Sequence, residues 1–112
     1  MAFVAVARGY EVLYAHAESG PFAERIAGAL KTLLPAHGEG LVYRNGLYLL
    51  RYRPSVLVEL GFIDSPADMA LLTDAEWRER ACRVIAEDLA EFLEETGHGG
   101  TEAQSAEAQS HG

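Results

Sequence analysis

Residues 54–63 read Pro-Ser-Val-Leu-Val-Glu-Leu-Gly-Phe-Ile, an apolar run that contains a single carboxylate, Glu59. The turn signal Asp64-Ser65-Pro66 follows it. An apolar run of this length between turn signals predicts a strand that is buried on both faces. An ionised glutamate is costly in such a strand unless it has a partner. Glu59 is therefore expected to lie at the strand end and pair with Arg51 or Arg53, to be protonated, or to have a chemical role.

Composition limits the classes of partner that the chain can have. Its 112 residues are enough for one domain, and about half of them (49%) are apolar. With 9 basic and 17 acidic residues the net charge is −8, which argues against nucleic acid and anionic membrane surfaces as partners. We expect no membrane span and no secretory signal peptide, because the apolar runs are short and the start lacks a basic segment.

Cys82 is the only cysteine, so the chain has no internal disulfide and no cysteine-based zinc cluster. The helical pattern around it predicts a buried, unreactive side chain. The cysteine content does not indicate a cellular compartment.

The first half of the chain predicts two strands around a helix. Residues 10–14 alternate as a strand does, with Tyr10 on one face and Glu11 on the other. Ser19 is a candidate N-cap for an amphipathic helix that reaches residue 33. Proline and glycine predict a loop over residues 35–40, and residues 47–51 are expected to form a second strand before the one that carries Glu59.

The second half predicts two helices and a tail. Ser65 and Pro66 indicate the start of a short helix, and a capping box of Thr73 and Glu76 indicates a long one that ends near Gly97. The remaining residues hold no large apolar side chain, so 97–112 are expected to be a disordered tail. The folded part, 1–96, is predicted to be α/β, a partial sheet flanked by helices in the order β-α-β-β-α-α.

Few residues are candidates for chemistry. His37 is expected in a polar loop, and His98 and His111 in the tail. His16, followed by Glu18, is the one histidine beside a predicted strand, and we interpret it as partly exposed at the strand end rather than as a metal ligand. No nucleophile elbow or glycine-rich phosphate loop occurs. Glu59, at the carboxyl end of a strand, is the candidate general base or acid, with an ion pair as the alternative.

Four segments taken together resemble a known family. They are residues 8–14 (RGYEVLY), 47–51 (LYLLR), 54–63 (PSVLVELGFI) and 68–72 (DMALL). In this order they are similar to the second half of the catalytic domain of the zinc-dependent N-acetylmuramoyl-L-alanine amidases. The resemblance implies hydrolysis of the amide bond between the lactyl group of muramic acid and L-alanine of the stem peptide in peptidoglycan. It also implies a location in the cell envelope and a role for Glu59 beside a zinc-bound water.

The family's zinc ligands are a histidine, a glutamate and a second histidine in segments that precede the strand matching residues 10–14, and we assign none of them here. We therefore expect an incomplete catalytic domain that does not act alone. A non-catalytic module that binds peptidoglycan or a partner, and an inactive fragment, are the alternatives. A half-sheet would also expose its strand edges, so self-association is expected.

Overall fold

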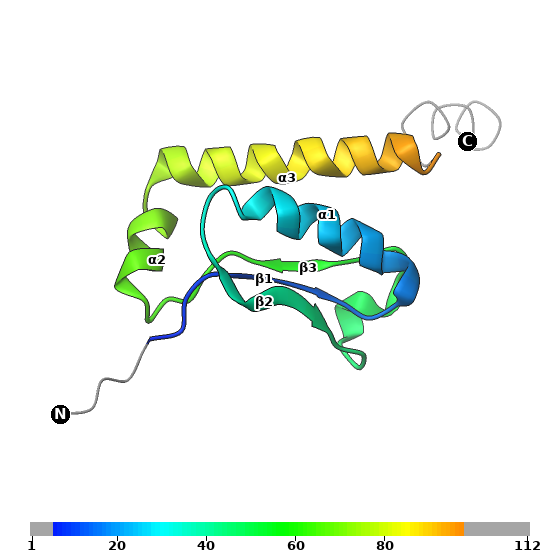
Figure 1. Cartoon of the computed structure of the whole chain (residues 1–112), viewed down its shortest axis with the longest axis horizontal. Coiled ribbons are helices and arrows are strands. Elements are labelled where there is room, and N and C mark those ends of the chain that lie inside the picture. Colours follow the sequence, from blue (N-terminus) through cyan, green and yellow to red (C-terminus); the bar gives the residue numbers. More distant parts are fainter. Residues whose placement is uncertain (1–5, 98–112) are drawn as a thin grey trace.

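The computed structural model describes residues 6–97 of the chain. Its strands form one mixed sheet in the order β2-β1-β3, and the two longer helices cover one face of it (Figure 1). This arrangement confirms the predicted α/β class. The prediction of a tail over 97–112, and with it His98 and His111, lies outside the described residues except for Gly97.

The central strand β1 (Tyr10–Tyr14) and helix α1 (Gly20–Leu30) form where the sequence predicts them. A single 3-10 turn, η1 (Ala17–Ser19), joins them. Ser19 is the N-cap residue of α1, but its hydroxyl does not cap the helix. The fully buried Ser19 Oγ instead accepts a hydrogen bond of 3.0 Å from the backbone N–H of Ser55. Ser19 therefore ties α1 to the segment that leads into the Glu59 strand.

The predicted loop over residues 35–40 is wrong, because strand β2 (Ala36–Tyr43) runs parallel to β1 there. The register shifts between Tyr10, which pairs with Ala36, and Val12, which pairs with Leu41. The glycines that suggested a loop lie in this irregular part of the strand, between residues 36 and 41. Gly40 has φ 78°, and a Cβ on it would lie 2.6 Å from the Tyr10 ring, so glycine is required at this position.

Two expectations for the middle of the chain are also corrected. Residues 48–51 form a 3-10 helix, η2 (Tyr48–Arg51), and not a strand. Leu47 and Leu50 turn inward three residues apart, which is the period of a 3-10 helix. The Glu59 strand, β3 (Leu57–Glu59), is short and antiparallel to β1. It lies at the edge of the described sheet and is only partly buried, so the expected strand buried on both faces is not formed.

Helices α2 (Pro66–Leu72) and α3 (Ala75–Glu95) complete the fold. The Ser65 hydroxyl caps α2 as predicted, by accepting a hydrogen bond of 3.1 Å from the Asp68 N–H. The predicted capping box of α3 is wrong. Asp74 is the N-cap, and Thr73 instead donates to the carbonyl of Met69 at the end of α2. Helix α3 ends at Glu95, and Gly97 follows with φ 80°, close to the predicted end.

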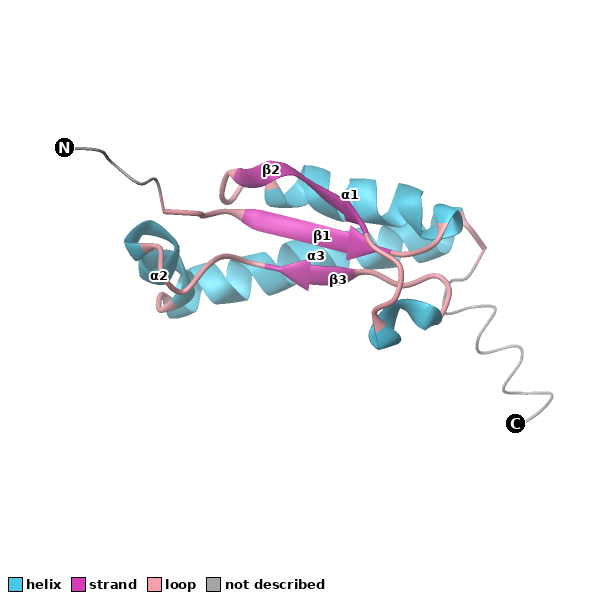
Figure 2. Cartoon of the chain, turned by 90° about the horizontal axis from the view of Figure 1, so that it is seen from below, coloured by secondary structure: helices cyan, strands magenta, loops and turns pink. Residues whose placement is uncertain are grey.

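The main core lies between the sheet and helices α1 and α3. The Phe22 and Phe92 rings stack across the two helices with centroids 4.8 Å apart. A smaller cluster of Leu13, Ala15 and Leu50 lies on the opposite face of the sheet, where Figure 2 shows no long helix. The buried side chains of the main core are Tyr10, Val12, Phe22, Ala23, Ile26, Ala27, Leu30, Leu34, Trp77, Ala81 and Phe92.

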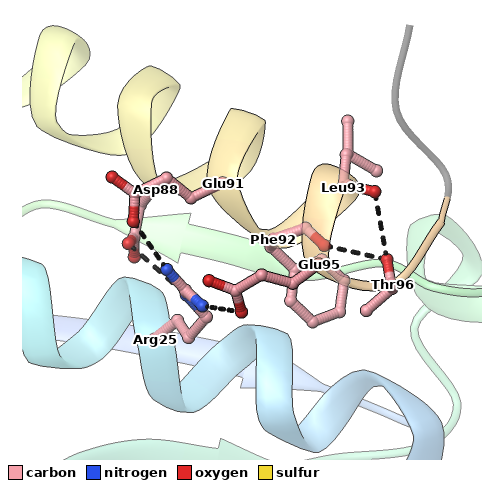
Figure 3. Close-up of polar contacts among 7 residues, drawn as sticks. All are labelled: Arg25, Asp88, Glu91, Phe92, Leu93, Glu95 and Thr96. Carbon is pink, nitrogen blue, oxygen red and sulfur yellow. Dashed lines mark hydrogen bonds and ion pairs between the residues drawn. The ribbon is translucent and has the colours of Figure 1, made fainter. Parts of the chain in front are cut away.

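Polar contacts also join the two long helices. Arg25 on α1 reaches Asp88 (3.6 Å), Glu91 (2.8 Å) and Glu95 on α3 (Figure 3). Burial raises the pKa of Asp88, and Arg25 opposes that rise. One guanidinium therefore balances the charge of three carboxylates.

The solvent side of α3 carries Cys82, which is exposed and not buried as predicted. Its neighbour Ala81 lies in the core, and one residue along a helix turns the side chain by about 100°. Among residues 6–97, no helix combines the length and the apolarity needed to cross a bilayer.

Candidate functional site

Glu59 is the last residue of β3, and its side chain is exposed. The ion pair considered as its alternative role is not formed. Arg53 pairs instead with Glu18, with 3.1 Å between Nη1 and Oε1. The Arg51 guanidinium lies 3.6 Å from the centroid of the Tyr48 ring and donates to the Tyr52 hydroxyl. The Glu59 carboxylate therefore points to solvent at the end of a strand, where a substrate can reach it.

A second carboxylate lies beside Glu59 on the neighbouring strand. Glu11 of β1 pairs with Glu59 of β3 in the antiparallel register. Paired residues of this kind have Cβ atoms about 4.5–5.5 Å apart on the same face of the sheet. Like charges in this position are unfavourable for the fold, so the pair concentrates negative charge without a structural gain. The alternation in residues 10–14 predicted that Glu11 lies on the face of the strand away from Tyr10. The sequence did not indicate which strand pairs with this one.

A third carboxylate holds the backbone around this pair. Asp68 of α2 is 0% exposed, and its Oδ2 accepts hydrogen bonds from the N–H groups of Gly9 (2.8 Å) and Phe62 (3.0 Å). Its Oδ1 lies 2.9 Å from Nε of Arg8. Gly9 leads into the strand of Glu11, and Phe62 follows that of Glu59. The sequence offered one weak signal for Asp68, which is a charged residue in a short helix that was expected to pack against the sheet.

The histidines do not join this site. The strand does not continue through His16, which is half-buried two residues beyond β1, and Glu18 is engaged by Arg53. His16 lines a cavity of about 260 Å³ together with Asn45 and Arg51, at the η2 end of the sheet. His37 is half-buried in β2, with its ring 4.8 Å from that of Phe62, and not in the solvated loop that was predicted.

Comparison with known proteins identifies the family of the chain. The sequence model of the family described as N-acetylmuramoyl-L-alanine amidase matches residues 2–91. The chain belongs to this family. It is 38% identical over 104 residues to an uncharacterised cell wall amidase of Bacillus anthracis, a match that covers 82% of this chain and 19% of the relative. It is 42% identical over 62 residues to an N-acetylmuramoyl-L-alanine amidase of Mycobacterium tuberculosis, covering 53% of this chain and 25% of that protein.

Two solved amidases share the fold. The catalytic domain of the amidase CwlV from Bacillus (Paenibacillus) polymyxa superimposes with a TM-score of 0.69 at 26% identity, over 79% of this chain and 50% of that chain. The amidase CwlD of Clostridioides difficile, solved in complex with the lipoprotein GerS, gives a TM-score of 0.68 at 26% identity, over 78% and 47%. The chain therefore spans about half of the solved amidases and a quarter or less of the curated relatives.

Zinc is the metal on which this amidase family generally depends. Between residues 6 and 97, no three His, Cys, Asp or Glu side chains gather into a metal-binding group. The Glu11 and Glu59 pair offers two carboxylates, whereas a catalytic zinc has about three protein ligands and an open position. The described residues alone do not fit a zinc ion.

Proposed function

We propose that this chain supplies the catalytic glutamate of a peptidoglycan amidase. The bond cleaved is the amide between the lactyl group of muramic acid and L-alanine of the stem peptide. The observation that carries the proposal is the exposed carboxylate of Glu59 at the end of β3, within the Val-Glu-Leu-Gly-Phe segment of an amidase-family chain. Peptidoglycan, the substrate of this chemistry, is the proposed partner.

Glu59 acts in this proposal as general base and then as general acid. Its carboxylate takes a proton from the attacking water while the water oxygen bonds to the amide carbon. The carbon–nitrogen bond then breaks, and Glu59 returns the proton to the leaving nitrogen. The products are the lactyl carboxylate and the free amine of L-alanine. The exposure of Glu59 suits these transfers, because water and the leaving group must both reach it.

The proposal also holds that this chain alone is an incomplete catalytic domain. Its match covers 50% of the Paenibacillus polymyxa catalytic domain. A zinc ion, as the family's metal, would take its ligands from the part of the domain that the match does not cover. What residues 6–97 contribute is the carboxylate and the sheet that presents it.

A joined domain tests the proposal. The full chain is fused behind the uncovered half of the Paenibacillus polymyxa catalytic domain, and release of the stem peptide from a muramoyl peptide is followed by chromatography. Glu59→Gln removes the proton acceptor and keeps the shape of the side chain. It is expected to lower kcat by about 100-fold or more. Glu94→Gln, at an exposed position of α3, is the matched control and is expected to leave kcat unchanged.

A joined domain in which Glu59→Gln retains activity within about threefold of the unmutated protein contradicts the role of Glu59. A joined domain that binds peptidoglycan but cleaves nothing supports the non-catalytic module instead.

A further inference from the structure

One buried side chain links the two strands that carry the carboxylate pair. Asp68 lies on α2, and every described contact of its carboxylate is with a residue outside that helix. Gly9 is two positions before Glu11, and Phe62 is three positions after Glu59. Both backbone N–H groups donate to the same oxygen, Oδ2, at 2.8 and 3.0 Å. A single atom therefore holds the start of β1 against the exit of β3.

Asp68 is itself held in one place. Its backbone N–H donates to the Ser65 hydroxyl at the N-terminus of α2, and Arg8 Nε lies 2.9 Å from its Oδ1. Gly61 makes room for it: a Cβ on Gly61 would lie 3.1 Å from Oδ2, and φ there is 147°. Glycine in the Glu-Leu-Gly-Phe segment is thus favoured by its backbone conformation as well as by the carboxylate that packs against it.

The ion pair with Arg8 alone does not account for a carboxylate in this position. Its ion pair with Arg8, whose side chain is 36% exposed, adds little to stability. The carboxylate fixes the relative position of two backbone segments, because it can accept hydrogen bonds from both at once. With 0% exposure, Asp68 cannot touch a substrate.

We propose that Asp68 is a positioning residue, which fixes the backbone on either side of the Glu11 and Glu59 pair and so sets where the Glu59 carboxylate lies. This inference rests on the proposed function of Glu59. Displacing a catalytic group by about 1 Å can cost about 100-fold in rate, so fixing the backbone three residues after Glu59 is expected to affect the rate.

The first experiment needs no catalysis. Amide hydrogen exchange is measured by NMR on the full chain, unmutated and as Asp68→Ala. The Gly9 and Phe62 amides are expected to exchange about tenfold faster or more in the variant, while the Ile26 amide in the core of α1 changes less. Asp64→Ala, in the exposed turn before α2, is the control and is expected to change neither site. Unchanged exchange at Gly9 and Phe62 would overturn the proposal.

The second experiment separates positioning from mere structural support. Kinetics are measured on the joined domain at a temperature where circular dichroism shows the unmutated protein, Asp68→Ala and Asp68→Asn to be folded. Asp68→Ala is expected to lower kcat by about tenfold or more, with KM within about twofold of the unmutated value. Asp68→Asn, which keeps an oxygen acceptor, is expected to recover part of that loss.

The outcomes distinguish this inference from the function on which it rests. An active domain that depends on Glu59 but keeps its kcat in Asp68→Ala overturns the role of Asp68 alone. A domain that remains active in Glu59→Gln overturns both.

Discussion

The hydroxyl of Tyr10 gives a prediction that runs against the usual expectation for a core mutation. Tyr10 is 0% exposed, and its buried Oη makes no hydrogen bond to the described residues. A buried hydroxyl without a partner costs about 1–3 kcal/mol. Tyr10→Phe removes that oxygen and keeps the ring that packs on Gly40. We expect the free energy of unfolding to rise by about 1 kcal/mol, which is a rise of about 4–8 °C in Tm for a domain of this size.

The same variant should change the response to alkali. Burial raises the pKa of Tyr10 above its ordinary value, so the folded chain holds this proton more tightly than the unfolded chain does. Its contribution to stability is then constant below about pH 10 and falls as the pH rises through that value, by up to about 1.4 kcal/mol per pH unit. Tyr10→Phe should lack this loss.

Urea unfolding followed by circular dichroism, at pH 7 and at pH 10.5, measures both effects. Tyr43→Phe is the matched control because its side chain is 58% exposed, and it should match the unmutated chain at both pH values. If Tyr10→Phe is less stable than the unmutated chain by more than about 0.5 kcal/mol, the hydroxyl has a partner, such as a bound water, and the reasoning is wrong.

Three further predictions concern the surface and the helix pair. Arg25→Met is expected to lower Tm at pH 7 more than Arg83→Met does, because it leaves three carboxylates without their shared cation. The difference should shrink at pH 4, since burial raises the pKa of Asp88 and protonation relieves the repulsion; equal losses at both pH values would contradict this. Cys82 is expected to react with one equivalent of a thiol reagent in the folded chain. Sedimentation analysis should show a mass that rises with concentration, because β2 and β3 leave open sheet edges; a constant monomer mass argues against it.

Local signals in the sequence predicted the helices well. The Ser65 cap indicated the start of α2, and the amphipathic pattern after Ser19 indicated α1, whose buried face packs in the main core. Caps and periodicity depend on residues a few positions apart, so the sequence displays them directly.

The strands and the site depended on partners far along the chain. Glycines in residues 36–43 suggested a loop until pairing with β1 turned them into a bulged strand. Glu59 was found as a candidate, but its cross-strand neighbour Glu11 and the clamp from Asp68 come from positions that no local pattern connects. Such contacts require the register and the helix placement to be known first.

The contact between Gly61 and Asp68 has a consequence for the evolution of this family. A side chain at position 61 would press on the carboxylate at position 68, and it would also be strained by the φ of 147° there, so two separate features favour glycine at this position. Across an alignment of relatives, sequences that keep the aspartate should therefore also keep the glycine. The most recognisable segment of the chain would then be constrained in part by a helix that begins several residues later.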